Sequence, residues 1–331
     1  MSSRLWTVVR LCIGLAIVIF LVAGLDLASV AGRLGRADYR LVVVGVAGLT
    51  AVHGLAALTW RSICARLAGV QLPWPMTLRA YYAAQALGGV TPANLAGDAY
   101  RVVAMTSAGH GWQASVAPIL LQRATSYLAL AALALGASAV LAASTPLPPG
   151  IVVAGVAVSV AVGLAAAALL APPSFLGGLL GRLAALVGAP RSTDPPAPAR
   201  TRIQAAGIGL ALGFAFHAVS VLFTWLLVVA VEPSAATSGV AAAVVVARLS
   251  LAVPISPSGL GIQEGALALM LASLGFAPQV ALAGLLLGRI ALVTTTIIGV
   301  LALVAGHSRL PRRFSGSTAS LDSAGISRPS R

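Results

Sequence analysis

Long runs of hydrophobic residues, separated by short polar segments, dominate the chain. A helix needs about 20 mostly apolar residues to cross a bilayer, and several runs approach or exceed that length. Because the runs are continuous and lack the alternation of a membrane β-strand, they predict an all-α polytopic membrane protein. About six full spans are expected, at residues 8–28, 41–60, 114–142, 150–171, 203–231 and 278–305.

Two further hydrophobic stretches, residues 80–113 and 235–277, contain residues that break helices. Each stretch is expected to form either a re-entrant helix pair or two full spans, and the charges in 80–113 favour re-entrance there. Interrupted backbone at membrane depth is tolerated where it lines a cavity enclosed by protein or filled with water. The predicted helix breaks are Pro92, Gly97, Pro254, Pro257, Gly259 and Gly261.

Three other segments are shorter or more polar than a span. Residues 174–188 predict an interfacial helix, because the segment is too short to cross and carries the single charge of Arg182. Residues 189–202 are rich in proline and arginine and predict a polar linker. Residues 308–331 have the basic, serine-rich composition of a disordered tail.

The charge distribution orients the predicted spans. The net charge is +14, yet only 8% of residues are charged, whereas a soluble domain has about 25%. Arginines concentrate in segments 61–79, 182–202 and 309–331, which are assigned to the cytoplasm together with both termini. The loop at 31–40 also carries three arginines and does not fit this assignment. This distribution explains the positive charge without a nucleic-acid partner. The 2 cysteines are too few for a disulfide framework or a metal site, and no cofactor is expected.

These loop assignments predict a duplicated chain. Each half holds three full spans and one returning element, and because three is odd, the second half must be inverted relative to the first. Inverted-topology repeats are common among secondary transporters. The expected architecture is one membrane domain over residues 1–307, with half-repeats at about 5–143 and 150–305.

A pair of ionisable residues repeats between the two halves. Asp98 precedes Arg123, and Glu264 precedes Arg289, by the same 25 residues. Placing an ionisable group inside a membrane costs free energy, and such residues usually have a function. We interpret the two acids as cavity residues that handle protons or pair with arginine, with purely structural ion pairs as the alternative.

The arginines near these acids have two interpretations. Arginine matches the geometry of phosphate, so Arg123 and Arg289 are predicted either to contact an anionic lipid headgroup or to compensate the acids. Arg101 is a further cavity candidate, with a snorkelling position at the interface as its alternative. Arg248 is a weaker candidate of the same kind, with compensation of Glu232 or Glu264 as its alternative.

Two histidines also occupy matching positions in the halves. His53 and His217 predict a proton relay, because histidine titrates near neutral pH; the alternative is interhelical hydrogen bonding. No cluster of acids or histidines has metal-ligand spacing, which argues against a membrane enzyme that acts on lipid phosphates.

Two segments carry a family resemblance. Residues 88–101 (GGVTPANLAGDAYR) and 254–265 (PISPSGLGIQEG) resemble the two signatures of the lysylphosphatidylglycerol synthase transmembrane region, also called the flippase-like domain family. Two departures weaken the expectation of a shared substrate. Gly88 and Gly89 stand where the family often has an asparagine, and Gln263 stands where it often has a basic residue.

The resemblance implies a protein that moves lipids, such as aminoacylated phosphatidylglycerol or lipid-linked sugars, between leaflets. We therefore expect a translocase for an anionic or glycosylated lipid in the bacterial inner membrane, and no enzymatic activity. The alternative is a non-transporting subunit that presents lipid to a separate glycosyltransferase or synthase. Bifunctional relatives carry a soluble aminoacyl-transferase domain after the membrane part, whereas only the tail 308–331 follows here, so synthesis of lysyl-lipid is not expected.

Overall fold

The structure, a computed structural model, describes residues 27–89, 91, 94–144, 149–168, 198–252 and 261–307. Most of the predicted first span and linker lie outside these residues, as do the interfacial helix, the tail and the helix breaks Pro92, Pro254, Pro257 and Gly259. The described helices are α2 (Leu27–Gly35), α3 (Tyr39–Ala51), α4 (His53–Leu67), α5 (Trp74–Gly88), α6 (Leu95–Ser107), α7 (Trp112–Ser144), α8 (Pro149–Ala168), α10 (Ala199–Val231), α11 (Ser238–Arg248), α12 (Ile262–Ser273) and α13 (Pro278–His307), with two 3₁₀ turns, η2 (Pro233–Ala235) and η3 (Leu249–Ala252).

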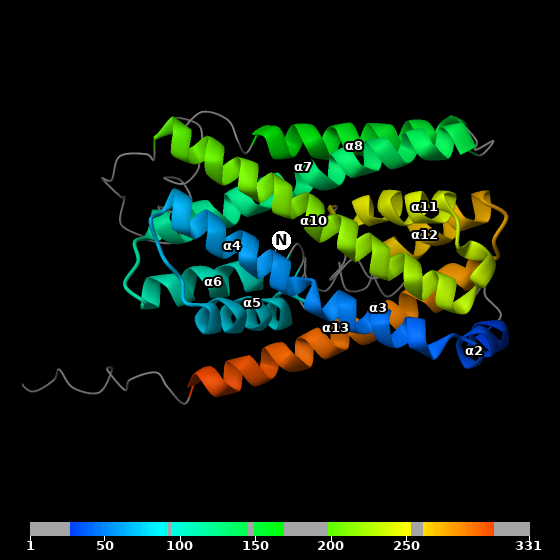
Figure 1. Ribbon diagram of the computed structural model, residues 1–331, viewed down its shortest axis with the longest axis horizontal. Helices are drawn as coiled ribbons and strands as arrows, with labels where there is room; N and C mark the ends of the chain where they lie inside the picture. Colours follow the sequence, from blue (N-terminus) through cyan, green and yellow to red (C-terminus); the bar gives the residue numbers. More distant parts are fainter. Residues whose placement is uncertain are drawn as a thin grey trace, which may run out of the picture.

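The long helices confirm the all-α polytopic membrane fold. Four segments of the described chain are long and apolar enough to cross a membrane, namely Tyr39–Leu67, Trp112–Ala143, Ala199–Val231 and Pro278–Ala305. Helix α8 has 20 residues, about 30 Å at ~1.5 Å per residue, a length equal to the thickness of the hydrocarbon core. In Figure 1 these helices run roughly along the long axis of the molecule.

One predicted boundary is wrong, because the span expected at 41–60 continues as α4 to Leu67. Arg61, the first residue after the predicted span, lies within α4. Its Nε donates a hydrogen bond to the Leu72 carbonyl at 2.7 Å, and its guanidinium lies 5.0 Å from the centre of the Trp74 ring. The charge is therefore satisfied while the aliphatic stem stays on the helix surface.

The two broken stretches form pairs of short helices. Helices α5 and α6 have 15 and 13 residues, and α11 and α12 have 11 and 12. At ~1.5 Å per residue none exceeds about 23 Å, which is less than the ~30 Å hydrocarbon core. The structure therefore supports re-entrant pairs in both halves over pairs of full spans.

The two halves run in opposite directions through the fold. A Cβ added to Gly45 of α3 would lie 2.5 Å from Leu227 near the end of α10, whereas one added to Gly209 near the start of α10 would lie 3.1 Å from Ile63 of α4. The segment formed by α3 and α4 therefore runs antiparallel to α10. Figure 1 shows α5 and α6 toward one end of the long axis, and α11 and α12 toward the other.

The helix contacts repeat with the same symmetry. Helix α5 packs against α13, and its counterpart α11 packs against α7. Helix α6 packs against α7 as α12 packs against α13, and α4 packs against α7 as α10 packs against α13. Each re-entrant pair therefore contacts the last span of both halves, which confirms the predicted inverted repeat.

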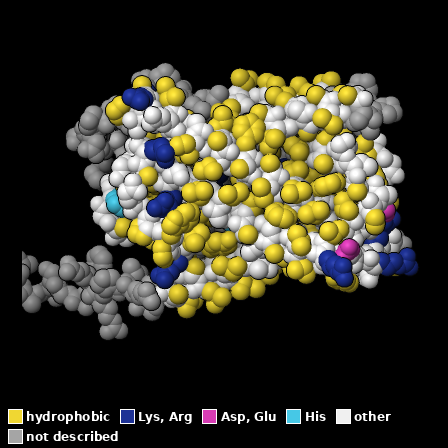
Figure 2. All heavy atoms as spheres, viewed as in Figure 1, with side chains coloured by type: hydrophobic (Ala, Val, Ile, Leu, Met, Phe, Trp, Pro, Cys, Tyr) yellow, Lys and Arg dark blue, Asp and Glu magenta, His cyan; other side chains and the backbone are white. Residues whose placement is uncertain are grey.

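Charged residues lie at the ends of this bundle and apolar residues across its middle. Figure 2 shows hydrophobic side chains over the central band and arginines toward both ends. At one end, Arg33 of α2 donates to Glu232 at 2.6 Å. The hydroxyl of Ser234 and the guanidinium of Arg33 together lower the pKa of the Glu232 carboxyl. This distribution matches a membrane that encloses the central band.

Close backbone contacts hold the re-entrant pairs in place. A Cβ on Gly299 of α13 would lie 2.2 Å from the Tyr82 carbonyl of α5, and a Cβ on Gly97 would lie 2.3 Å from the Ala84 carbonyl. The prediction of Gly97 as a helix break is therefore wrong: it lies inside α6, where the missing side chain lets α6 approach α5. Gly261 does precede a helix, and its φ of 82° suits glycine.

The contact between α13 and α5 generates a stability prediction. Gly299→Ala should lower the free energy of unfolding by about 1–3 kcal/mol, because a backbone carbonyl leaves no room for the new methyl group. Gly136→Ala on the exposed face of α7 meets nothing within 4 Å and should be neutral or stabilise by up to about 1 kcal/mol. Thermal unfolding in detergent checks both variants, and equal melting temperatures would contradict the close contact.

Candidate functional site

The first acid–arginine pair forms a network at the start of α6. Asp98, in the first turn of α6, accepts hydrogen bonds from the Nη2 of Arg101 at 2.5 Å and from the Nε of Arg123 on α7. Arg123 also donates to the hydroxyl of Tyr127 at 3.4 Å. Only 16% of the Asp98 side chain is exposed, so these bonds replace the water that the carboxylate loses inside the membrane.

Arg101 is buried, which excludes the alternative of a snorkelling side chain at the interface. It is 4% exposed, and its guanidinium lies 5.4 Å from the ring centre of Trp60 and 5.2 Å from that of Tyr81. Its Nη1 donates to Gln122 at 2.7 Å, which in turn donates to the Ala56 carbonyl at 2.8 Å. Arg101 therefore joins α4, α5, α6 and α7.

The second pair repeats the arrangement in the inverted half. Glu264, in the first turn of α12, accepts hydrogen bonds from Arg289 on α13 and from the backbone N–H of Gly261 at 2.9 Å. In both halves the acid thus sits near the positive end of a helix dipole. Arg123 and Arg289 occupy matching positions, each about 16 Å along its helix at ~1.5 Å per residue and therefore inside a segment long enough to cross a membrane.

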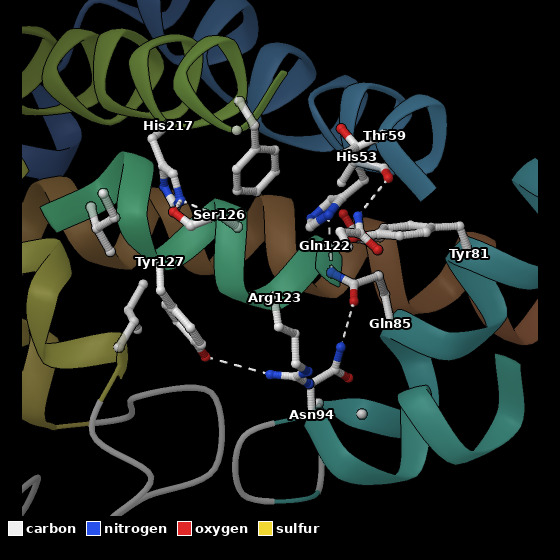
Figure 3. Close-up of a pocket in the computed structure, with 18 of the residues that line it drawn as sticks. His53, Thr59, Tyr81, Gln85, Asn94, Gln122, Arg123, Ser126, Tyr127 and His217 are labelled. Carbon is white, nitrogen blue, oxygen red and sulfur yellow. Dashed lines mark hydrogen bonds between the residues drawn. The ribbon is translucent and has the colours of Figure 1, made fainter. Parts of the chain in front are cut away.

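A cavity of about 350 Å³ lies beside the first pair, between the two halves. Pockets that bind small molecules have volumes of about 300–1,000 Å³. Helices α4, α5, α6 and α7 line it from the first half, and α10, α11, η3 and α13 line it from the second. Figure 3 shows polar side chains from several of these helices pointing into the space. Its polar lining comprises His53, Thr59, Tyr81, Gln85, Thr91, Asn94, Arg101, Gln122, Arg123, Ser126, Tyr127, His217, Arg248, Thr295 and Thr296.

Both predicted histidines line the cavity, but each belongs to its own hydrogen-bond network (Figure 3). Asn94 donates to the Oε1 of Gln85 at 3.0 Å, which orients the Gln85 amide so that its Nε2 donates to the Nδ1 of His53 at 3.0 Å. His217 shares a hydrogen bond of 3.0 Å with Ser126. This geometry confirms interhelical hydrogen bonding for both residues.

The ring of Phe216 lies near both histidines. Its centre is 6.4 Å from the His53 ring and 5.0 Å from the His217 ring. Among the described residues no hydrogen-bonded chain joins the two imidazoles. A proton relay between them therefore stays a prediction that would require water in the cavity.

Not every predicted cavity residue lines this space. Arg101 and Arg123 do, and Asp98 binds both, but Glu264 and Arg289 do not. On α13 the cavity instead touches Leu292, Thr295 and Thr296, one to two helical turns beyond Arg289. The second ion pair thus supports the α12–α13 junction and lies outside the cavity wall.

The polar lining is concentrated in the first half. The residue offset that maps Asp98 onto Glu264 also maps Arg123 onto Arg289, so α6 and α7 can be compared with α12 and α13 position by position. Four polar residues around the first pair correspond to apolar ones in the second half. They are Arg101 to Leu267, Gln122 to Gly288, Ser126 to Leu292, and Tyr127 to Val293. The duplicated framework is retained, while the cavity chemistry has diverged.

Of the two interpretations of Arg248, compensation of a glutamate is wrong. Glu232 binds Arg33, and Glu264 binds Arg289. Arg248 instead lines the cavity from the end of α11. Its Nε is buried and has no hydrogen-bond partner among the described residues, and none of the acids described there forms an ion pair with it.

The dipole of α11 offsets only part of the free energy that it costs to bury the Arg248 guanidinium without a counter-ion. A basic residue in the last turn gains about 0.3–1 kcal/mol from the helix dipole, whereas burying an unpaired ion costs several kcal/mol. The sequence left compensation open for Arg248 because Glu232 and Glu264 flank it along the chain. The sequence analysis missed three polar cavity residues, because the corresponding positions in the second half are apolar or differently aligned. They are Gln85, Gln122 and Tyr127.

Comparison with known proteins identifies the family. The family described as the lysylphosphatidylglycerol synthase TM region matches residues 7–299 of the 331-residue chain. The chain therefore belongs to this family, which ties it to lipid handling in a membrane. No match is found among curated proteins.

The partners of the two ion pairs predict which of two arginine variants is less stable. Arg289→Gln should destabilise the protein more than Arg123→Gln, because Glu264 has no second arginine among the described residues, whereas Asp98 keeps Arg101. Removing one partner of a buried pair costs about 3–5 kcal/mol, so the Arg289→Gln loss should approach that range. Thermal and denaturant unfolding in detergent measure the losses.

Two controls sharpen this comparison. Arg36→Gln removes an exposed arginine and should change the free energy of unfolding by less than about 0.5 kcal/mol. The double variant Glu264→Gln/Arg289→Gln should recover part of the loss, because no unpaired charge remains. Equal losses for Arg123→Gln and Arg289→Gln, or strictly additive losses in the double variant, would contradict the assigned partners.

Proposed function

We propose that this member of the lysylphosphatidylglycerol synthase transmembrane family is a lipid translocase. It moves an anionic or glycosylated lipid between the leaflets of the bacterial inner membrane. The observation that carries the proposal is the polar cavity of about 350 Å³ between two inverted halves, lined by hydrogen-bonding side chains within a bundle of membrane-spanning helices.

The architecture supports transport because the cavity lies between two inverted halves. In inverted-repeat transporters the substrate site lies at the interface of the halves, and one half rocks against the other around it. Here α5 packs against α13 and α11 packs against α7, so each re-entrant pair touches both halves. A small rotation at these contacts would open the cavity toward one face or the other.

The lining supports a lipid headgroup as the ligand. Guanidinium, amide, imidazole and hydroxyl groups face the cavity and match the phosphate and hydroxyl oxygens of a headgroup. The acyl chains would remain among the exposed apolar side chains of the surrounding helices. Leu292 and Leu251 supply apolar contacts beside the polar groups.

The same proposal includes the orientation of the protein in the membrane and its partners. Both termini lie in the cytoplasm, as the arginine distribution indicates. Membrane lipids are the primary partners, and a glycosyltransferase or synthase would supply or consume the translocated lipid. The role is transport and includes no covalent step.

Translocation in liposomes tests the proposal. The purified protein is reconstituted into vesicles with fluorescent phosphatidylglycerol, phosphatidylethanolamine or a glycosyl diacylglycerol, and a membrane-impermeant quencher reports the lipid that reaches the outer leaflet. The wild type should accelerate exchange of at least one lipid over protein-free vesicles. Gln85→Leu should slow it about tenfold, because the Asn94–Gln85–His53 network at the cavity wall is lost.

The matched control changes the same residue type outside the cavity. Gln71 is exposed and lies in the connection between α4 and α5, so Gln71→Leu should exchange lipid at the wild-type rate. If the wild type matches protein-free vesicles for every lipid, the translocase proposal fails. Lipid retained by an inactive protein would then favour the subunit that presents lipid to an enzyme.

A further inference from the structure

Arg248 differs from the other charged residues around the cavity because it has no counter-ion in the described chain. The described acids are Asp38, Asp98, Glu232 and Glu264. Asp38 caps the start of α3 by accepting the N–H of Arg40, and the other three bind Arg101 and Arg123, Arg33, and Arg289, respectively.

The cavity therefore carries an excess of positive charge. Three guanidinium groups, those of Arg101, Arg123 and Arg248, line it, and the carboxylate of Asp98 binds the first two. The excess is two positive charges, with Arg248 lining the space from the end of α11. Inside a membrane such an excess is stabilised when an anion enters the cavity.

The buried Nε of Arg248 points to the same conclusion. This N–H has no hydrogen-bond partner among the described residues, and buried donors are almost always paired. Arginine presents its N–H groups as a planar fork that matches two oxygens of a phosphate. The second half contributes little other polar chemistry to the cavity, namely His217, Thr295 and Thr296.

We propose that Arg248 is the residue that binds the phosphate group of the ligand in the cavity. This inference rests on the proposed function for the identity of the ligand as a lipid, but it assigns a binding residue whose role can be measured without transport. The first half orients the rest of the headgroup through Gln85 and Arg123, and Arg248 completes the site from the second half.

Binding to the purified full-length protein in detergent tests the assignment. Dioctanoyl phosphatidylglycerol should bind the wild type and raise its melting temperature, because a ligand that binds only the folded state stabilises it. An uncharged dioctanoylglycerol glucoside and inorganic phosphate are the comparison probes. Binding of phosphate alone would identify a free-anion site, and binding of both phosphate-bearing probes would show that the phosphate is recognised irrespective of its source.

Arg248→Gln should weaken binding of phosphatidylglycerol at least tenfold, with Arg248→Lys intermediate because lysine keeps the charge but loses the fork. Without ligand, Arg248→Gln should melt at or above the wild-type temperature, because it removes an unpaired buried charge. That result separates binding from misfolding. Arg36→Gln removes an exposed arginine and should bind like the wild type.

Failure of this assignment differs from failure of the translocase proposal. If Arg248→Gln binds phosphatidylglycerol and moves lipid as the wild type does, Arg248 does not hold the phosphate, although transport stands. If the wild type moves no lipid but loses phosphatidylglycerol binding on Arg248→Gln, the assignment stands and transport fails. A lower melting temperature of Arg248→Gln without ligand would overturn the assignment, because it would reveal a structural partner for Arg248.

Discussion

An ion pair between an acid in the first turn of a short helix and an arginine on the following span determines this structure. The pair occurs twice, as Asp98 with Arg123 and as Glu264 with Arg289. A short helix cannot cross the bilayer, and the backbone N–H and C=O groups at its end within the membrane must form hydrogen bonds to protein or water. Joining the acid to an arginine within the following span holds the second short helix of each pair against that span and pairs both charges in a medium of low dielectric constant.

The two copies of this ion pair have different surroundings, and the difference creates the site. Around Asp98 the pair extends through Arg101, Gln122 and Tyr127, whereas the corresponding positions around Glu264 are apolar. A symmetric framework permits two equivalent arrangements of the halves, while an asymmetric lining can bind one polar ligand. The repeated ion pair thus accounts for the fold, and the difference between the two halves accounts for the polar lining of the cavity.

Much of this fold follows from sequence because the bilayer restricts the possibilities. Span positions, inversion and the partners of Asp98 and Glu264 were predicted from apolar runs, loop arginines and one repeated spacing. Contacts between helices were harder to predict. For Arg248 the sequence could not separate a cavity position from compensation of a nearby glutamate, and the packing of α11 places it against the cavity. Gly97 was assigned to a break although it allows α6 to approach α5. Such roles depend on tertiary packing, which single-sequence patterns do not encode.

Labelling of single cysteines from each side of the membrane tests the inverted architecture most directly. Cys12 and Cys64 are replaced by serine, and one cysteine at a time is placed at Gln71, Ser107, Ala236 or Ala277, which are all exposed at helix ends. A membrane-impermeant maleimide should label positions 71 and 107 from one face and positions 236 and 277 from the other. Labelling of 107 and 277 from the same face would contradict the inverted repeat.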